Sequence, residues 1–231
     1  MSIASNIADI RARIDSACQR CQRDPGTVRL VAVSKTHPAA SVDAAAAAGQ
    51  EIFGENYVQE FAAKTEAVQA PVQWHFIGSL QSNKVKYLAG RVAMIHSVDR
   101  LSLADELDRQ WGKLGQTLEI LIEVNLGDEE SKGGASTDAA ITLVRRIATL
   151  PHLQVCGLMA LPPYLEDGEA VRPYFRRLRE LAAEIDACKI AGVSMRELSM
   201  GMSHDFEVAI EEGATLVRVG TAIFGSRGPR N

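Results

Sequence analysis

Short apolar runs rich in β-branched residues alternate along the chain with stretches whose apolar positions recur at helical spacing. This alternation is typical of repeated strand–helix units and of a parallel sheet. The predicted strands are Val28–Val33, Ile52–Gly54, Trp74–Ile77, Met94–Ser97, Leu118–Val124, Gln154–Met159, Glu197–Met200 and Leu216–Val219. The helices predicted between them are Ser41–Ala48, Val58–Val68, Leu101–Leu114, Asp138–Thr149, Gly168–Ala187 and Asp205–Glu212.

Eight predicted strands in a chain of 231 residues indicate an α/β protein built as a single (β/α)₈ TIM barrel. Before the first strand, Ile3, Ile7, Ile10 and Ile14 predict an extra N-terminal amphipathic helix. No linker-like tract divides residues 1–231, so we expect one domain. An open, doubly wound sheet stays a structural alternative, because a run as short as Ile52–Gly54 is a weak strand signal.

Composition narrows the function classes. Hydrophobic residues make up 46% and charged residues 23%, as in an ordinary globular protein. The net charge of −4 and the scattered Lys and Arg argue against a nucleic-acid partner. No apolar run approaches the roughly 20 residues of a membrane span. We expect a cytoplasmic protein.

The four cysteines are too few and too irregularly spaced for a disulfide framework in a chain of this length. Cys18 and Cys21 form a lone C-x-x-C on the predicted first helix, with no second pair to complete a metal site. We therefore expect two half-buried helix cysteines and no bound metal, with a metal or redox role as the alternative.

Polar residues follow several of the predicted strands, at the barrel end where ligands bind. They are Ser34–His37, Glu55–Tyr57, Gly78–Lys84, Asn125, Gly201–Asp205 and Gly220–Thr221. Lys35 directly ends the first strand, where partial desolvation favours a neutral, nucleophilic amine that can form a Schiff base with an aldehyde. The alternative is an ordinary solvated lysine at a strand end.

Two segments near the end of the chain resemble a phosphate cradle. The segment from Ser199 through Met200 to Ser203 ends a strand and opens a helix, and Gly220 and Thr221 follow the last strand. Barrels often hold phosphate between the loops after strands seven and eight. The alternative is a helix N-cap by Ser203 beside an ordinary tight turn.

Arg218 lies just inside the end of the last predicted strand and, by alternation, points the same way as Gly220. A buried arginine needs an acceptor, which would be a phosphate oxygen, an unprotonated ring nitrogen, or an internal acid such as Glu55 or Glu123.

These segments resemble the YggS/PROSC family of pyridoxal 5'-phosphate (PLP) homeostasis proteins. The matching motifs are Val31–Lys35, Phe53–Glu60, Trp74–Gly78, Leu80–Lys84, Ser97–Asp99, Val124–Asn125, Glu130–Gly133, Gly157–Ala160, Leu198–Ser203 and Val217–Gly225. They are collinear and cover almost the whole chain.

The resemblance implies a fold-type III barrel like the N-terminal domain of alanine racemase, with PLP bound covalently to Lys35 as a Schiff base. It places the phosphate near Ser203, Gly220 and Thr221 with Ser199 close by, Arg218 beside the pyridine nitrogen or the phosphate, and Asn56 in the lining. Met200 and Met159 are expected to pack near the ring.

Three functions stay open at this point. The first is a non-enzymatic protein that binds, buffers or delivers PLP, because the sequence stops at Asn231 and leaves no room for the second domain that gives racemases their opposite-face acid. The second is a racemase of narrow specificity, with Tyr57, Tyr164 or His204 as that acid. The third is a sugar-phosphate aldolase with a Schiff base on Lys35.

The resemblance also implies a monomer, with PLP-dependent apoenzymes as possible recipients. The segment Gly127–Ala135 is expected to be a solvated loop, with a mobile lid as the alternative.

Overall fold

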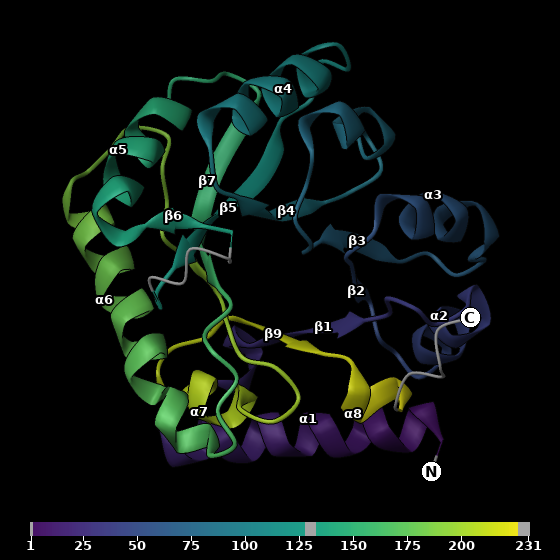
Figure 1. Ribbon diagram of the computed structural model, residues 1–231. Helices are drawn as coiled ribbons and strands as arrows, with labels where there is room; N and C mark the ends of the chain where they lie inside the picture. Colours follow the sequence, from purple (N-terminus) through teal and green to yellow (C-terminus); the bar gives the residue numbers. More distant parts are fainter. Residues whose placement is uncertain (1, 128–132, 226–231) are drawn as a thin grey trace.

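The computed structural model describes residues 2–127 and 133–225 and contains a closed barrel of eight parallel strands. The strands are β1 (Arg29–Val33), β2 (Ile52–Glu55), β3 (Gln73–Phe76), β4 (Met94–Val98), β5 (Leu118–Asn125), β7 (Leu153–Ala160), β8 (Glu197–Ser199) and β9 (Leu216–Val219). They pair in chain order; β9 closes onto β1, and β4 pairs directly with β5. Figure 1 shows the closed ring. The predicted barrel is confirmed, and the open sheet is wrong.

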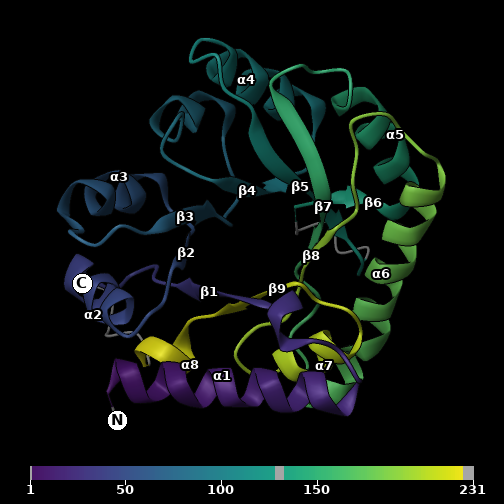
Figure 2. The same ribbon diagram turned by 180° about the vertical axis from the view of Figure 1, so that it is seen from behind.

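Helices cover the outside of this barrel (Figure 2). They are α2 (Ala39–Ala47), α3 (Val58–Ala67), α4 (Leu101–Gly112), α5 (Thr137–Ile147), α6 (Arg172–Ala187), α7 (Phe206–Glu211) and α8 (Thr221–Phe224). Three short 3₁₀ helices are η1 (Pro25–Thr27), η2 (Ser82–Tyr87) and η3 (Gly168–Val171).

Three details differ from the predicted elements. The helix predicted over Gly168–Ala187 divides into η3 and α6, and Pro173 lies in the first turn of α6, where its missing N–H costs no helical hydrogen bond. A two-residue strand, β6 (Ala135–Ser136), pairs with the end of β5. The tight turn considered as the alternative for Gly220 and Thr221 is instead the start of the four-residue helix α8, with Gly220 as its N-cap residue.

The predicted N-terminal helix is α1 (Ile3–Arg20), and a capping box between Ser2 and Ser5 begins it. Its buried face includes Ile7, Ile10 and Ile14, and it packs on α2, α7 and α8. In Figure 1 it runs across one side of the barrel. The helix therefore buries the outer faces of elements from both ends of the chain.

The apolar side chains form two buried clusters. The smaller fills the barrel interior and consists of Val31, Ile52, Met94, Leu121, Cys156, Met159 and Leu216. The larger lies between the strands and the outer helices; Leu30 and Ala32 belong to it while Val31 belongs to the smaller one. Strand residues thus alternate between the two cores. The packed interior leaves the mouth of the barrel as the place for a ligand.

All four cysteines are free. Cys18 is fully buried rather than half-buried as expected, and the Cys21 thiol donates to the carbonyl of Ala17 at 3.2 Å. Residues 2–127 and 133–225 contain no group of three or more His, Cys, Asp or Glu side chains arranged to hold a metal ion. No helix in these ranges is long and apolar enough to cross a bilayer.

Candidate functional site

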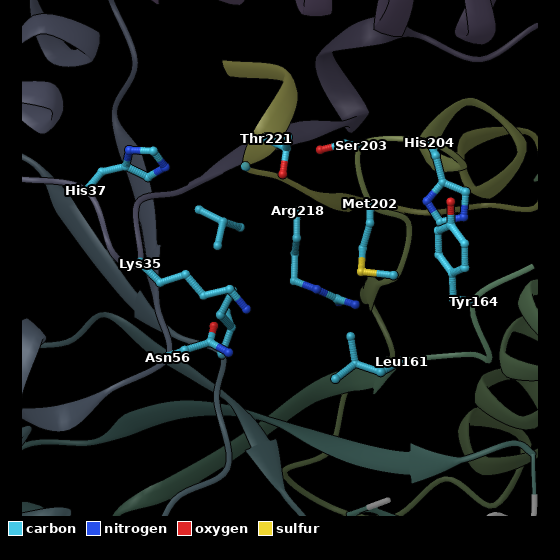
Figure 3. Close-up of a pocket in the computed structure, with 13 residues that line it drawn as sticks. Lys35, His37, Asn56, Leu161, Tyr164, Met202, Ser203, His204, Arg218 and Thr221 are labelled. Carbon is cyan, nitrogen blue, oxygen red and sulfur yellow. The ribbon is translucent and has the colours of Figure 1, made fainter. Parts of the chain in front are cut away.

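A cavity of about 410 Å³ lies at the carboxyl ends of the strands. Figure 3 shows Lys35 and Asn56 entering it from one side, Tyr164 and His204 from the other, and Arg218 between them. The lining residues are Val33, Lys35, His37, Asn56, Ile77, Leu161, Tyr164, Met202, Ser203, His204, Arg218, Gly220 and Thr221. Six predicted site residues therefore lie together: Lys35, Asn56, Ser203, Arg218, Gly220 and Thr221.

A network of buried polar groups fixes the backbone around Lys35. The Ser34 hydroxyl donates to Glu55 Oε1 at 2.6 Å, and the Lys64 ammonium donates to the Ser34 carbonyl at 2.7 Å. On the other side of Lys35, the backbone N–H of Thr36 donates to Glu60 Oε2 at 2.7 Å. We call Ser34, Thr36, Glu55, Glu60 and Lys64 the lysine clamp.

The clamp holds Thr36 in an unfavourable conformation. Its φ of 67° lies in the left-handed region, which a β-branched residue rarely adopts. Strain of this kind persists only where neighbouring contacts enforce it, and it is concentrated at functional sites. It fixes the direction of the backbone directly after Lys35.

A buried ion pair is the centre of the clamp. Lys64 Nζ lies 2.6 Å from Glu55 Oε1, and these side chains are 8% and 0% exposed. Burial raises the pKa of Glu55, although Lys64 and Ser34 oppose the shift. Glu55 thus forms its ion pair with Lys64 and is not the ion-pair partner that was considered for Arg218.

Two turns bring hydroxyl groups to the same side of the cavity, as Figure 3 shows for Ser203 and Thr221. Gly201 has a φ of +90°, and a Cβ there would lie 2.6 Å from the Ala209 Cβ, so only glycine fits this turn. The Ser203 hydroxyl accepts the Ala222 N–H at 3.5 Å, which joins the two turns. Ser203 does not cap α7, whose N-cap residue is Asp205.

Arg218 is buried beneath the cavity and donates to two oxygens. Its Nη1 donates to Ser199 Oγ at 2.5 Å, and its Nη2 donates to the Ala160 carbonyl at 2.8 Å. Desolvation lowers its pKa to about 10, while Glu123 and Asp205 raise it through their charge. No carboxylate of the described residues forms an ion pair with it.

A chain of hydrogen bonds runs from Arg218 into the barrel interior. His96 Nδ1 lies 2.9 Å from Ser199 Oγ, and His96 Nε2 lies 2.9 Å from His75 Nδ1. Because Arg218 donates to Ser199, the serine proton is available to His96 Nδ1, and His96 Nε2–H can donate to His75. Burial lowers the pKa of His75 to about 3 and that of His96 well below its usual value, so both rings are neutral at pH 7.

Comparison with known proteins places this arrangement in a family. The family described as "Alanine racemase, N-terminal domain" matches residues 5–228. A "Pyridoxal phosphate homeostasis protein" of Aquifex aeolicus is 48% identical over 228 residues, covering 98% of this chain and 99% of the relative. The chain belongs to the pyridoxal phosphate homeostasis protein family.

Solved structures agree with this membership. The PLP-bound structure of PipY from Synechococcus elongatus superposes with a TM-score of 0.85 at 36% identity, covering 97% of this chain and 100% of that one. An alanine racemase of Corynebacterium glutamicum superposes with a TM-score of 0.71 at 16% identity, covering 97% of this chain and 61% of that one. The second likeness shows the shared barrel fold alone.

Within this family member, two predicted site residues and one predicted ring neighbour do not line the cavity. Ser199 lies below it and reaches it only through Arg218. Met200 is fully buried in the core between barrel and helices, and Met159 is buried in the barrel interior. Neither methionine is among the lining residues.

Several lining residues are not among the site residues predicted from the sequence. His37 and Met202 lie in segments that the sequence had marked as polar strand ends, and Leu161 directly follows β7. Their position after a strand was the available signal. Tyr164 and His204, considered as racemase acids, line the cavity with ring centroids 4.7 Å apart. Tyr57, the third candidate, is the N-cap residue of α3 and is not in the lining.

Proposed function

We propose that this chain binds PLP in the mouth of the barrel, with the aldehyde held covalently by Lys35, and acts in PLP homeostasis. One observation carries the proposal: a lysine amine, two hydroxyls and an arginine converge on a single cavity of about 410 Å³. The relatives named pyridoxal phosphate homeostasis proteins and the PLP-bound PipY support it. When bound, PLP supplies an aldehyde that a lysine amine can capture.

The donors present fit this cofactor. Ser203 and Thr221 can donate hydroxyls to a phosphate, and the backbone at Gly220 allows its close approach. Asn56 Oδ1 is buried and has no hydrogen-bond partner among residues 2–127 and 133–225, as expected for an acceptor reserved for a ligand donor. Ser199 and Met200 lie outside the lining: Ser199 accepts a hydrogen bond from Arg218, and Met200 is buried in the core between the strands and the outer helices.

Arg218 bears on what the bound cofactor can do. A guanidinium cannot readily accept a proton, so beside the pyridine nitrogen it favours the unprotonated ring, which is a weaker electron sink. Tyr164, one of the two candidate racemase acids in the lining, is 71% exposed, so it gives little shielding from water. Both features favour a carrier over a racemase, and we propose a non-enzymatic role.

The wider setting is part of the same proposal. Free cysteines and an acidic net charge of −4 suit a reducing cytoplasm without nucleic-acid partners. We propose a monomer that passes PLP to PLP-dependent apoenzymes.

Absorption spectra of the purified chain with added PLP, from about 300 to about 500 nm, test the proposal. A band near about 420 nm in the wild type, absent from Lys35→Ala, is the expected result. Lys86→Ala, which removes an exposed lysine of η2, should keep the band. No band in the wild type would overturn PLP binding through Lys35. Amino-acid turnover lost in Lys35→Ala would overturn the non-enzymatic role.

A further inference from the structure

A second, smaller cavity of about 250 Å³ adjoins the first. The two share Asn56, Ile77 and Leu161 in their walls. The second cavity also reaches Glu123, near the end of β5, and Gly133. A small molecule in it would therefore lie beside the space that receives the Lys35 amine.

The side chain of Glu123 lines this second cavity. Glu123 is 8% exposed, and no residue that the structure describes donates a hydrogen bond to it or forms an ion pair with it. Burial and the negative charge of Asp99 raise its pKa to about 7, while Arg218 opposes the shift. A carboxylate this buried lacks most of the hydration of an exposed one, so a hydrogen-bond donor in the cavity would stabilise its charged form.

Asp99 adds a second carboxyl at the same place. It is 20% exposed and forms an ion pair with Arg100 at 2.6 Å. A Cβ on Gly133 would lie 3.6 Å from Asp99 Oδ2 and 3.9 Å from both Glu123 oxygens, so both carboxyls approach the glycine backbone. Gly133 leaves this space open to a ligand.

The charge and size of the cavity select the ligand. Two carboxyls, one of them buried and without a partner among the described residues, call for a compact cation that donates hydrogen bonds, and a primary ammonium has three N–H donors on a single point charge. The described residues offer no third acid, His or Cys ligand here for a metal ion.

We propose that this cavity is an ammonium subsite, in which the Glu123 carboxylate binds the –NH₃⁺ group of an incoming primary amine beside Lys35. Proton transfer from the ammonium to the carboxylate then yields a neutral amine and a protonated Glu123. The neutral amine has the lone pair that attack on an aldehyde requires. The role of this subsite rests on the proposed function, because the bound amine would compete with the Lys35 amine for the aldehyde of PLP.

The test measures binding of propylammonium chloride to the full-length chain, with and without PLP, by calorimetry. The same chain selectively ¹³C-labelled at glutamate carboxyls reports the Glu123 resonance without any mutation. We expect binding that shifts this resonance and weakens at least about tenfold in Glu123→Gln. The control is Glu119→Gln on the same strand, whose side chain is 43% exposed and pairs with Arg196, and it should bind like the wild type.

Tetramethylammonium chloride, which carries the same charge without N–H donors, should not bind. Unchanged propylammonium affinity in Glu123→Gln, equal affinity for tetramethylammonium, or an unmoved Glu123 resonance would each overturn the proposal. Because the PLP-free chain is titrated as well, failure of PLP binding gives a separate result.

A capped tripeptide with a central lysine distinguishes the two sources of the amine. Binding of both probes supports a subsite open to a lysine on another protein. Binding of propylammonium alone supports a free small amine.

Discussion

Glu123 and Arg218 are charged side chains held almost out of water at the same end of the barrel. Desolvation shifts both pKa values toward the neutral form, to about 7 for Glu123 and about 10 for Arg218. Arg218 obtains two hydrogen-bond acceptors, whereas Glu123 obtains no donor from the described residues. The desolvation of its charge is therefore less well compensated by hydrogen bonds at Glu123 than at Arg218.

This cost predicts an unusual pH dependence of stability. Because the folded-state pKa of Glu123 lies above its usual value of 4.5, the folded chain binds the extra proton between about pH 4.5 and about pH 7. The contribution of Glu123 to the free energy of unfolding therefore falls as pH rises through this window, by up to about 3 kcal/mol.

Glu123→Gln removes this titration. Urea unfolding at pH 5 and pH 8 should show the variant gaining on the wild type as pH rises, whereas Glu119→Gln should follow the wild type. A stability difference between Glu123→Gln and wild type that is constant with pH would contradict the assignment.

Strand alternation explains which single residues could be predicted. It placed Arg218 on the side of Gly220, and both line the cavity. The same rule, applied to the adjacent Ser199 and Met200, separates them: Ser199 contacts Arg218 inside the barrel, and Met200 packs in the outer core. The two-residue period of a strand therefore predicted the direction of these side chains better than closeness in sequence to a turn expected to bind phosphate.

At the scale of elements, the lysine clamp joins β1, β2 and α3. Lys64 of α3 contacts the Ser34 carbonyl after β1 and Glu55 of β2, so one side chain fixes three elements around Lys35. A buried ion pair adds little over an apolar pair, but loss of one partner leaves the other charge stranded.

Lys64→Met should therefore lower the free energy of unfolding by about 3–5 kcal/mol, because Glu55 loses its cation. The measurement is urea unfolding, with Lys113→Met at an exposed position as the matched control. The double variant Lys64→Met/Glu55→Gln should recover part of the loss. An unaffected Lys64→Met variant would mean that the clamp does not stabilise these elements.

The long helices could be predicted, and so could the six-residue α7, but two other short helical segments could not. The helices α4, α5 and α6 have wide apolar faces that bury residues such as Leu107, Val144 and Leu178, and all three were predicted. The helix α8 has four residues, too few for a helical period to be visible, and η2 is a 3₁₀ helix, whose three-residue turn does not follow the 3.6-residue period. Tertiary contacts decide such segments.

At the scale of the whole molecule, the eight alternating units determine a closed barrel, and closure determines the site. The cavity draws residues from the ends of β1, β2, β3, β7, β8 and β9, which are far apart in sequence. The hydrogen-bonded chain from Arg218 to His75 crosses the barrel interior between different strands, so it cannot be predicted from any single segment of the sequence. The only sign of this hydrogen-bonded chain in the sequence is that polar residues occur within otherwise apolar strands.

A peptide map tests whether PLP is attached covalently to Lys35, as we propose. The full-length chain is incubated with PLP, reduced with borohydride, digested, and analysed by mass spectrometry. We expect a reduced pyridoxyl phosphate group on the peptide that contains Lys35 and no comparable modification elsewhere. Modification centred on another lysine, or none at all, would contradict it.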